Sequence, residues 1–148
     1  MVFNNYYIMV PLIAWTIAQA IKVTIESIKE KKFKFSRFVG NGGMPSGHAA
    51  IVSSLSTMIL MENGVESVEF GIVTIFSLII LADAIGVRYE TGKQAKAIND
   101  IVEDLNENDI EVEIRQLKEQ VGHRPTEVLA GTLLGIAIAY VIYGLKLL

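Results

Sequence analysis

The chain has 148 residues, room for one domain, and 51% of them are hydrophobic, with a mean hydropathy of +0.43. This composition favours an integral membrane protein over a soluble one. The lack of cysteine excludes disulfides, zinc–thiolate sites and thiol catalysis, and the net charge of −3 argues against a nucleic-acid partner.

Four apolar stretches predict helices, at residues 6–28, 49–61, 68–87 and 128–148. The third and fourth have about 20 residues each, the length that a helix needs to cross the hydrocarbon core of a bilayer. The first contains Pro11, Gln19 and Lys22, so it should span while turning a polar face to other helices. The second is short and is by itself more typical of a buried or re-entrant helix.

The distribution of Lys and Arg predicts the orientation. These residues concentrate between the first and second stretches and between the third and fourth, whereas the link at 62–69 has none. By the positive-inside rule, both long loops are cytoplasmic and both termini lie outside. No basic residue precedes the first stretch, so we expect a membrane helix there and not a signal peptide. The protein is therefore predicted to be a multi-pass protein of the cell membrane.

The segment 89–122 is the hydrophilic insertion. Its apolar residues recur at helical spacing in two sets: Ala95, Ile98, Val102 and Leu105, then Ile114, Leu117 and Val121. We expect two short amphipathic helices joined by a turn, on the membrane surface or over the cytoplasmic face. The predicted fold is thus an all-α integral membrane bundle of about four transmembrane helices with a cytoplasmic amphipathic helical hairpin. It forms a single domain over residues 1–148.

Polar residues are predicted to converge at one face of this bundle. In an up-and-down arrangement, the start of the second helix, the end of the third and the start of the fourth lie together. Those places hold "PSGH" (45–48), "DAIGVR" (83–88) and "GHRPTEVLAG" (122–131), and Lys22 joins them from the first helix. Both histidines of the chain, His48 and His123, fall at these helix starts. This convergence indicates a site.

The chemistry of these groups suits an anion. Ser46 is a plausible N-cap, so free backbone N–H groups and the positive end of the helix dipole point at a ligand there. Gly42, Gly43 and Gly47 allow close backbone approach. Arg88 can bind phosphate oxygens in bidentate fashion, and two histidines can supply a nucleophile and a general acid. No metal or cofactor is needed for phosphoryl transfer by this set.

The motifs "PSGH" and "GHRPTEVLAG" resemble those of the type 2 phosphatidic acid phosphatase and vanadium haloperoxidase superfamily. The combination "GGMPSGHAA", "DAIGVRYETGKQA" and "GHRPTEVLAGTLLG" is closer still to the small divergent branch of that superfamily in bacteria and plants. The likeness covers the chain from Lys22 to Gly135.

The resemblance implies a role for each matching residue. His123 is the nucleophile that forms a phosphohistidine, Glu127 orients it in place of the larger family's aspartate, and His48 protonates the leaving oxygen. Ser46 and Gly47 bind phosphoryl oxygens, and Arg88 supplies the arginine of the third motif. This is a covalent two-step displacement with electrostatic stabilisation of the phosphoryl oxygens.

Three departures from the superfamily keep other possibilities open. The arginine expected six residues before His123 is replaced by Leu117, so Arg88 takes its role only across the insertion. The first motif, a lysine followed by Arg-Pro, is absent, and the candidates for its cations are Lys22, Lys93 and Arg37, in that order. The larger family has six spans, so a homodimer is a possible way to complete the bundle.

Each residue also has a structural interpretation. Ser46 can be an ordinary helix cap and Glu127 a first-turn acid favoured by the helix dipole. Asp83 is expected to be a structural partner of Lys22 or Arg88 more than a catalytic group. Gly131 and Gly135 are expected to mark close helix packing.

The predicted function is that of a metal-independent membrane phosphatase acting on a lipid phosphate or diphosphate. The alternative is a non-catalytic membrane protein of the same fold that binds a phosphate or lipid headgroup or acts as an assembly partner. A transporter ranks last, because the polar groups cluster at one face and do not extend through the bilayer.

Overall fold

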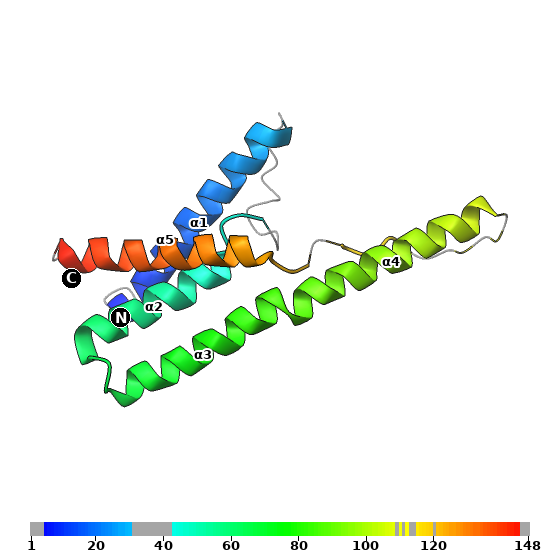
Figure 1. The fold of residues 1–148 in the computed structure, drawn as a ribbon. Helices are drawn as coiled ribbons and strands as arrows, with labels where there is room; N and C mark the ends of the chain where they lie inside the picture. The colour runs from blue at the N-terminus through cyan, green and yellow to red at the C-terminus, as the bar shows by residue number, and fades with distance from the viewer. Residues whose placement is uncertain are drawn as a thin grey trace.

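A computed structural model describes residues 5–30, 43–108, 110, 112, 115–119 and 121–145 of the chain. These residues form five helices: α1 (Tyr6–Glu30), α2 (Gly47–Asn63), α3 (Val68–Ile85), α4 (Val87–Glu107) and α5 (Pro125–Gly144) (Figure 1). The described part of the chain contains no strand. The predicted all-α bundle is therefore confirmed, with helix bounds within a few residues of the expected ones.

The described segments with the length and hydropathy of a membrane span are three: Tyr6–Ile28, Val68–Glu107 and Pro125–Gly144. The helix α2 has 17 residues, about 25 Å of helix, which is short for a crossing. It lies in the middle of the bundle, where it packs against α1, α3 and α5. The short second stretch of the sequence is thus a central helix with protein on several sides.

Small and hydroxylated residues allow α2 to occupy this central place. Ala49, Ala50, Ser53, Ser54 and Thr57 are all buried. The Ser53 hydroxyl donates to the Ala49 carbonyl at 2.7 Å, and the Thr57 hydroxyl donates to the Ser53 carbonyl at 2.7 Å. The hydroxyls are therefore satisfied within their own helix, and their small size lets neighbouring backbones approach.

Two of the three glycines of α5, Gly131 and Gly135, make the closest of these approaches. A Cβ added at Gly131 would stand 2.3 Å from the Ser46 carbonyl oxygen, and one at Gly135 would stand 2.1 Å from Ser53 Oγ. Real Cβ atoms do not come so near, so only glycine fits at these points. The prediction that Gly131 and Gly135 mark helix packing is confirmed.

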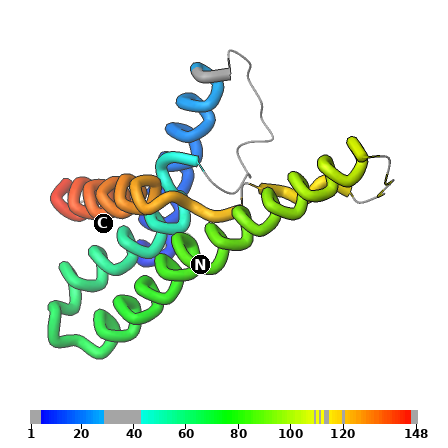
Figure 2. Tube along the Cα trace, turned by 45° about the vertical axis from the view of Figure 1, so that its right-hand side comes forward, coloured from blue at the N-terminus to red at the C-terminus, as the bar shows by residue number. Residues whose placement is uncertain are grey.

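The helices α3 and α4 form one nearly continuous rod that extends beyond the bundle (Figures 1 and 2). Gly86 joins them: its N–H donates to the Ala82 carbonyl at 2.8 Å, and its carbonyl accepts from the Glu90 N–H at 3.0 Å. The helical ladder therefore continues across the junction, although Gly86 itself departs from helical angles.

The predicted amphipathic hairpin is half correct. Its first helix is present as α4, but residues 115–119 are not helical, and Ile114 lies outside the described residues. The Asn99 side chain explains the difference, because it donates to the Leu117 carbonyl at 2.9 Å and accepts from the Leu117 N–H at 2.9 Å. Backbone groups that a helix would pair internally are thus paired with α4. We call the described residues 115–119 and 121–122 the return segment (Figure 2).

The first turn of α1 and the last turn of α5 lie at the same end of the bundle (Figure 1). At that end the Tyr7 hydroxyl donates to Asn63 Oδ1 and the Tyr143 hydroxyl donates to the Met61 carbonyl, each at 3.5 Å. The starts of α2 and α5 consequently meet at the opposite end.

Candidate active site

Three segments distant in sequence are joined by backbone hydrogen bonds at this opposite end. The Ser46 N–H, before α2, donates to the Glu127 carbonyl of α5 at 2.9 Å. The His123 N–H, before α5, donates to the Ala84 carbonyl of α3 at 3.1 Å. The structure therefore brings "PSGH", "DAIGVR" and "GHRPTEVLAG" together, as their placement in an up-and-down bundle predicts.

The two histidines face each other at this junction. Their ring centroids are 5.8 Å apart and the rings meet edge to face, with an interplanar angle of 83°. His123 is only 2% exposed, whereas His48 is open to the surface. Neither ring nitrogen of His123 has a hydrogen-bond partner among the described residues. Buried polar atoms are normally paired, so these two nitrogens mark the place where a ligand would be held.

Burial lowers the pKa of His123 from 6.5 to about 4, and the nearby charges of Lys22, His48 and Arg88 act in the same direction. The imidazole is therefore neutral at pH 7 and keeps a free lone pair. A neutral, buried imidazole beside a cationic cluster suits nucleophilic attack on an anion.

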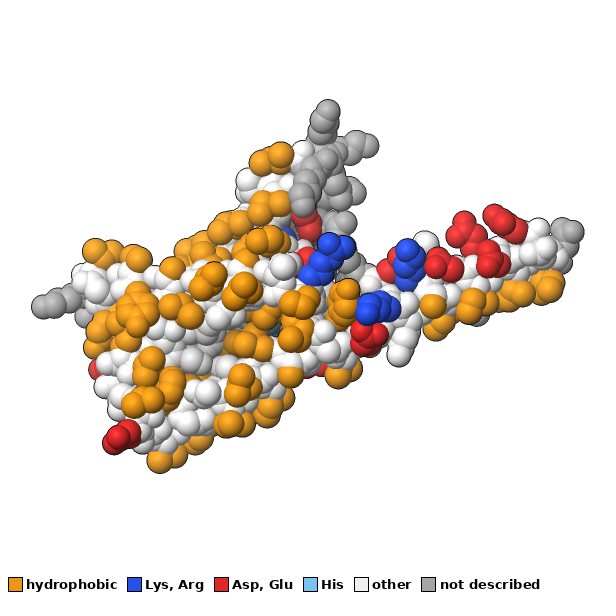
Figure 3. Space-filling view, in the orientation of Figure 1, with side chains coloured by type: hydrophobic (Ala, Val, Ile, Leu, Met, Phe, Trp, Pro, Cys, Tyr) orange, Lys and Arg blue, Asp and Glu red, His pale blue; other side chains and the backbone are white. Residues whose placement is uncertain are grey.

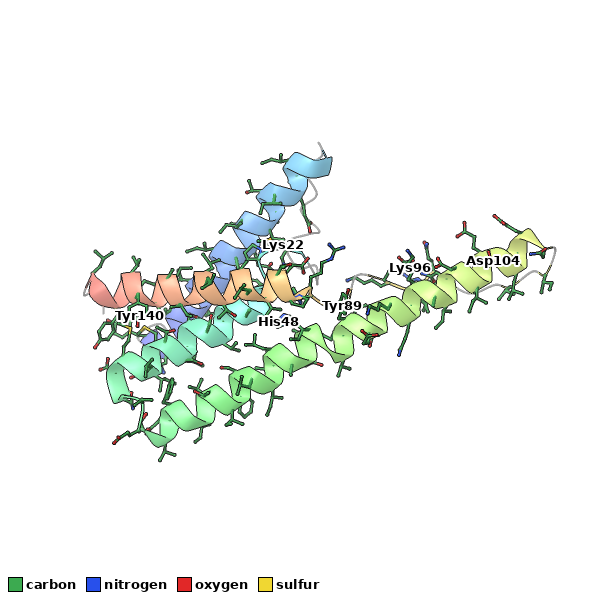
Figure 4. The ribbon with its side chains drawn as sticks, viewed as in Figure 1. Lys22, His48, Tyr89, Lys96, Asp104 and Tyr140 are labelled. Carbon is green, nitrogen blue, oxygen red and sulfur yellow. The ribbon has the colours of Figure 1, made fainter. Side chains whose placement is uncertain are left out.

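Lys22 comes to this cluster from α1 and is only 3% exposed. The carboxylates of Glu26 and Glu127 interact electrostatically with the Lys22 ammonium group. Gly43, with φ of +84°, leads the chain past this side chain, and a Cβ at Gly43 would stand 3.3 Å from Lys22 Cδ. Figure 4 shows Lys22 and His48 around the first turns of α5. The structure thus places Lys22 in the candidate site.

Arg88 approaches from the α3–α4 junction, where its Nε donates to Asp83 Oδ2 at 2.5 Å. The prediction that Asp83 is a structural partner is confirmed, with Arg88 as the residue it pairs with. The two side chains and His48 line a cavity of about 300 Å³, together with Ile79, Ile80 and Ala84 of α3. A cavity with charged groups at one end and branched aliphatic groups at the other suits an amphiphile.

The start of α2 is built as a cap. Ser46 is fully buried and its hydroxyl accepts from the Ala49 N–H at 3.3 Å, so the interpretation of Ser46 as an N-cap is confirmed. A Cβ added at Gly47 would stand 3.0 Å from Trp15 Cδ1, which shows how closely α1 packs here. Whether Ser46 and Gly47 also bind phosphoryl oxygens stays a prediction.

Glu127 and Lys93 make contacts other than the predicted ones. One Glu127 carboxylate oxygen accepts from the Arg124 N–H at 3.2 Å, as in a capping box, and no hydrogen bond of the described residues joins it to His123. Lys93 pairs with Glu90 at 2.8 Å and lies over the Tyr89 ring, on the exposed surface of α4. The structure does not bring Lys93 to the histidines, and Arg37 lies outside the described residues.

Trp15 is the residue of this region that the sequence reasoning did not place near the site. Trp15, Gln19 and Lys22 occur at i, i+4 and i+7 of α1. Trp15 and Gln19 lie against Gly47, the first residue of α2, and Lys22 lies against Gly43 in the loop before it. This spacing puts them on one helix face, which was a readable signal. This face of α1 packs against the site: Trp15 and Gln19 contact Gly47, and Lys22 contacts Gly43.

Comparison with known proteins agrees with these motifs. The model of a family described as the divergent PAP2 family matches residues 3–138. A relative from Bacillus subtilis (strain 168), named "uncharacterized membrane protein YuiD", is 38% identical over 149 residues, which cover 94% of each chain. No solved structure matches significantly. The match extends from the first helix through the histidine pair and most of α5, so the chain is a membrane protein of the divergent PAP2 family.

Proposed function

We propose that the protein is a metal-independent phosphatase that hydrolyses a lipid phosphate or diphosphate through a phosphohistidine. The observation that carries the proposal is His123: a buried, neutral imidazole without a hydrogen-bond partner among the described residues, facing a second histidine among cations. Membership of a PAP2-related family supports the same chemistry.

The first step forms a bond between a ring nitrogen of His123 and phosphorus while the bond from phosphorus to the lipid oxygen breaks. His48 gives its proton to the leaving oxygen, and the lipid departs as an alcohol, or as a monophosphate when the substrate is a diphosphate. Water then attacks the phosphohistidine, with His48 taking a proton from it, and inorganic phosphate leaves. Lys22 and Arg88 stabilise the negative charge on the phosphoryl oxygens. Ser46 and Gly47 are proposed to bind those oxygens and Glu127 to orient His123.

The cavity beside His48 supports a lipid as the substrate. Its lining passes from Arg88 and Asp83 to Ile79 and Ile80, which belong to a membrane helix. A phosphate at the histidines would therefore leave an apolar tail beside α3, in contact with the bilayer. We place the site at the cytoplasmic face, with both termini outside, on the charge distribution of the loops.

A non-catalytic binding protein is the second candidate, and two contacts favour it. Glu127 is engaged in capping α5, and Arg88 is held by Asp83, so two groups that catalysis would use already have partners. In this case the same cationic pocket binds a phosphate or lipid headgroup without cleaving it. The protein would then act as an assembly partner, in a homodimer or with another protein.

Phosphate release separates the two candidates. Purified protein would be incubated with a panel of lipid phosphates and diphosphates in chelator, as wild type, His123→Ala and His48→Ala. Asn63→Ala, at the opposite end of α2, is the control. We expect release by wild type and control and a strong loss in both histidine variants. Binding without release would support the non-catalytic protein, and equal release by all four would contradict the phosphatase mechanism.

A further inference from the structure

A second, larger cavity lies between α4, the return segment and the start of α5, with a volume of about 710 Å³. It shares no lining residue with the cavity beside His48 and Arg88. Gly43, before the motif that contains His48, and Gly122, directly before His123, form part of its wall. It is therefore a separate cavity next to the candidate active site, where the apolar helix α3 ends and the apolar helix α5 begins.

The lining of this cavity is basic. Four cations surround it, and they come from α4, the return segment and the start of α5: Lys93, Lys96, Lys118 and Arg124. Figure 3 shows Lys and Arg side chains gathered at this junction, whereas acidic side chains gather toward the far end of α4. In Figure 4, Lys96 and Asp104 mark these two parts of α4. The charges along α4 are thus segregated, with the positive part at the cavity.

The two carboxylates of the lining offset part of the positive charge, but among the described residues they form no ion pair with these cations. Glu119 accepts from Asn99 Nδ2 at 3.0 Å, and Glu127 accepts from the Arg124 N–H at 3.2 Å. Lys93 is paired with Glu90, but Lys96 and Lys118 have no ion pair among the described residues. Two lysines and an arginine side chain consequently remain available around one cavity.

The walls of the cavity are fixed by close contacts. The return segment is clamped to α4 by the two hydrogen bonds between Asn99 and Leu117. A Cβ at Gly92 would stand 2.3 Å from the Glu119 carbonyl oxygen, and one at Gly122 would stand 2.3 Å from the Tyr89 nitrogen. Because backbone packs directly on backbone at both glycines, the elements that carry the cations are fixed relative to one another, and the cations surround a defined cavity.

We propose that this cavity is a second anion site, which takes a phosphate-bearing group independently of the histidine pair. Arg124 can contact phosphate oxygens in bidentate fashion, and Lys96 and Lys118 supply further charge. The volume exceeds that of a phosphate and leaves room for an attached headgroup. The phosphate can come from a phosphorylated lipid or from free inorganic phosphate. The site does not require that the protein be catalytic.

Calorimetric titration with inorganic phosphate tests the proposal. The full chain carrying His123→Ala, which cannot form a phosphohistidine, would be reconstituted in phosphatidylcholine nanodiscs. We expect Lys118→Gln to weaken phosphate binding about fivefold, and Lys96→Gln/Lys118→Gln about tenfold, since partly exposed ionic contacts contribute about 1 kcal/mol or less each. Arg115→Gln is the matched control, because it removes the same charge from the return segment without lining the cavity.

Equal phosphate affinity in Lys118→Gln and Arg115→Gln would overturn the proposal. A second arm adds dioleoyl phosphatidic acid to the nanodiscs. If phosphatidic acid weakens phosphate binding in the His123→Ala protein but not in the double lysine variant, the occupant is a lipid headgroup. If phosphatidic acid has no effect while Lys118→Gln still weakens binding, the cavity takes free phosphate. Because hydrolysis is not measured, failure of this site and failure of the phosphatase mechanism remain distinguishable.

Discussion

The starts of α2 and α5 carry one histidine each at the same end of the bundle, yet the two are built differently. Ser46 caps α2 through its side chain, and His48 follows as an exposed residue of the first turn. Before α5, His123 is buried, with its backbone N–H fixed to α3, and Glu127 caps the helix from within. One histidine therefore has access to water and the other does not.

This difference in exposure suits the two histidines to different proposed roles, proton transfer for His48 and nucleophilic attack for His123. An exposed imidazole exchanges protons with solvent and can act as acid and base in turn. A buried imidazole with a lowered pKa stays neutral and keeps its lone pair for phosphorus. Burial lowers the pKa of His48 as well, and Arg88 and Lys22 act in the same direction, so the contrast between the two histidines lies in their exposure.

The largest predicted effect distinguishes the two histidines in catalysis. We expect His123→Ala to lower kcat at least about 10⁴-fold, because it removes the covalent intermediate, and His48→Ala about 10²- to 10³-fold. Acid-labile labelling of the protein by a lipid with a radioactive phosphate should persist in His48→Ala and vanish in His123→Ala. Labelling that vanishes only in His48→Ala would reverse the assignment.

The next effect concerns the contact between the two helix starts. Gly131→Ala places a methyl against the Ser46 carbonyl, so we expect a loss of about 1–3 kcal/mol in the free energy of unfolding. Denaturant unfolding in detergent measures it. Gly144→Ala in the same helix meets no atom within 4 Å and should cost far less. Similar losses in both variants would mean that the two helices do not meet at Gly131.

A smaller effect tests the burial of His123 through pH. The unfolded chain takes up a proton near pH 6.5, but the folded chain does so only near pH 4, because burial lowers the pKa of His123. Between these values the unfolded state binds more protons, so stability that is full above pH 6.5 is lost as the pH falls toward 4. His123→Gln should unfold with a weaker pH dependence in this window. An unchanged dependence would show that His123 is not the buried group responsible.

The smallest effect concerns the ion pair beside His48. Asp83 and Arg88 side chains are 39% and 43% exposed, so Asp83→Asn should destabilise the fold by about 1 kcal/mol or less. Phosphate release should change less in Asp83→Asn than in Arg88→Gln, because only Arg88 is proposed to contact the phosphoryl group. The reverse order would make Asp83 part of the catalytic machinery.

Much of this arrangement was readable from hydropathy and helix starts. Apolar runs of membrane length fix where α1, α3 and α5 lie, and an up-and-down order of the helices puts the starts of α2 and α5 at one end of the bundle, so His48 and His123 could be placed together from the sequence. Charge also limited the expected partner of Asp83 to Lys22 or Arg88, and the structure shows that it is Arg88. These inferences depend on local patterns and on the order of the elements.

The conformation of the return segment and the contacts of Glu127 and Lys93 could not be predicted. They depend on which of several hydrogen-bond partners each group pairs with, and the sequence pattern does not show this. Leu117 has helical spacing with its neighbours, but Asn99, 18 residues away, satisfies its backbone groups and removes the reason for a helix. Glu127 can orient a histidine or cap a helix, and the nearer backbone N–H holds one of its oxygens. Lys93 is similarly held by Glu90, within the same turn of α4.

The junction at Gly86 gives the molecule a lever. Residues Val68–Glu107 form a rod of 40 residues, about 60 Å long, with one end inside the bundle and the other well beyond it. A tilt of about five degrees at Gly86 would displace the far end of α4, which has 21 residues, by about 3 Å. The return segment is tied to this lever at Asn99 and leads to His123, so a force or a binding event far along α4 has a mechanical path to His123.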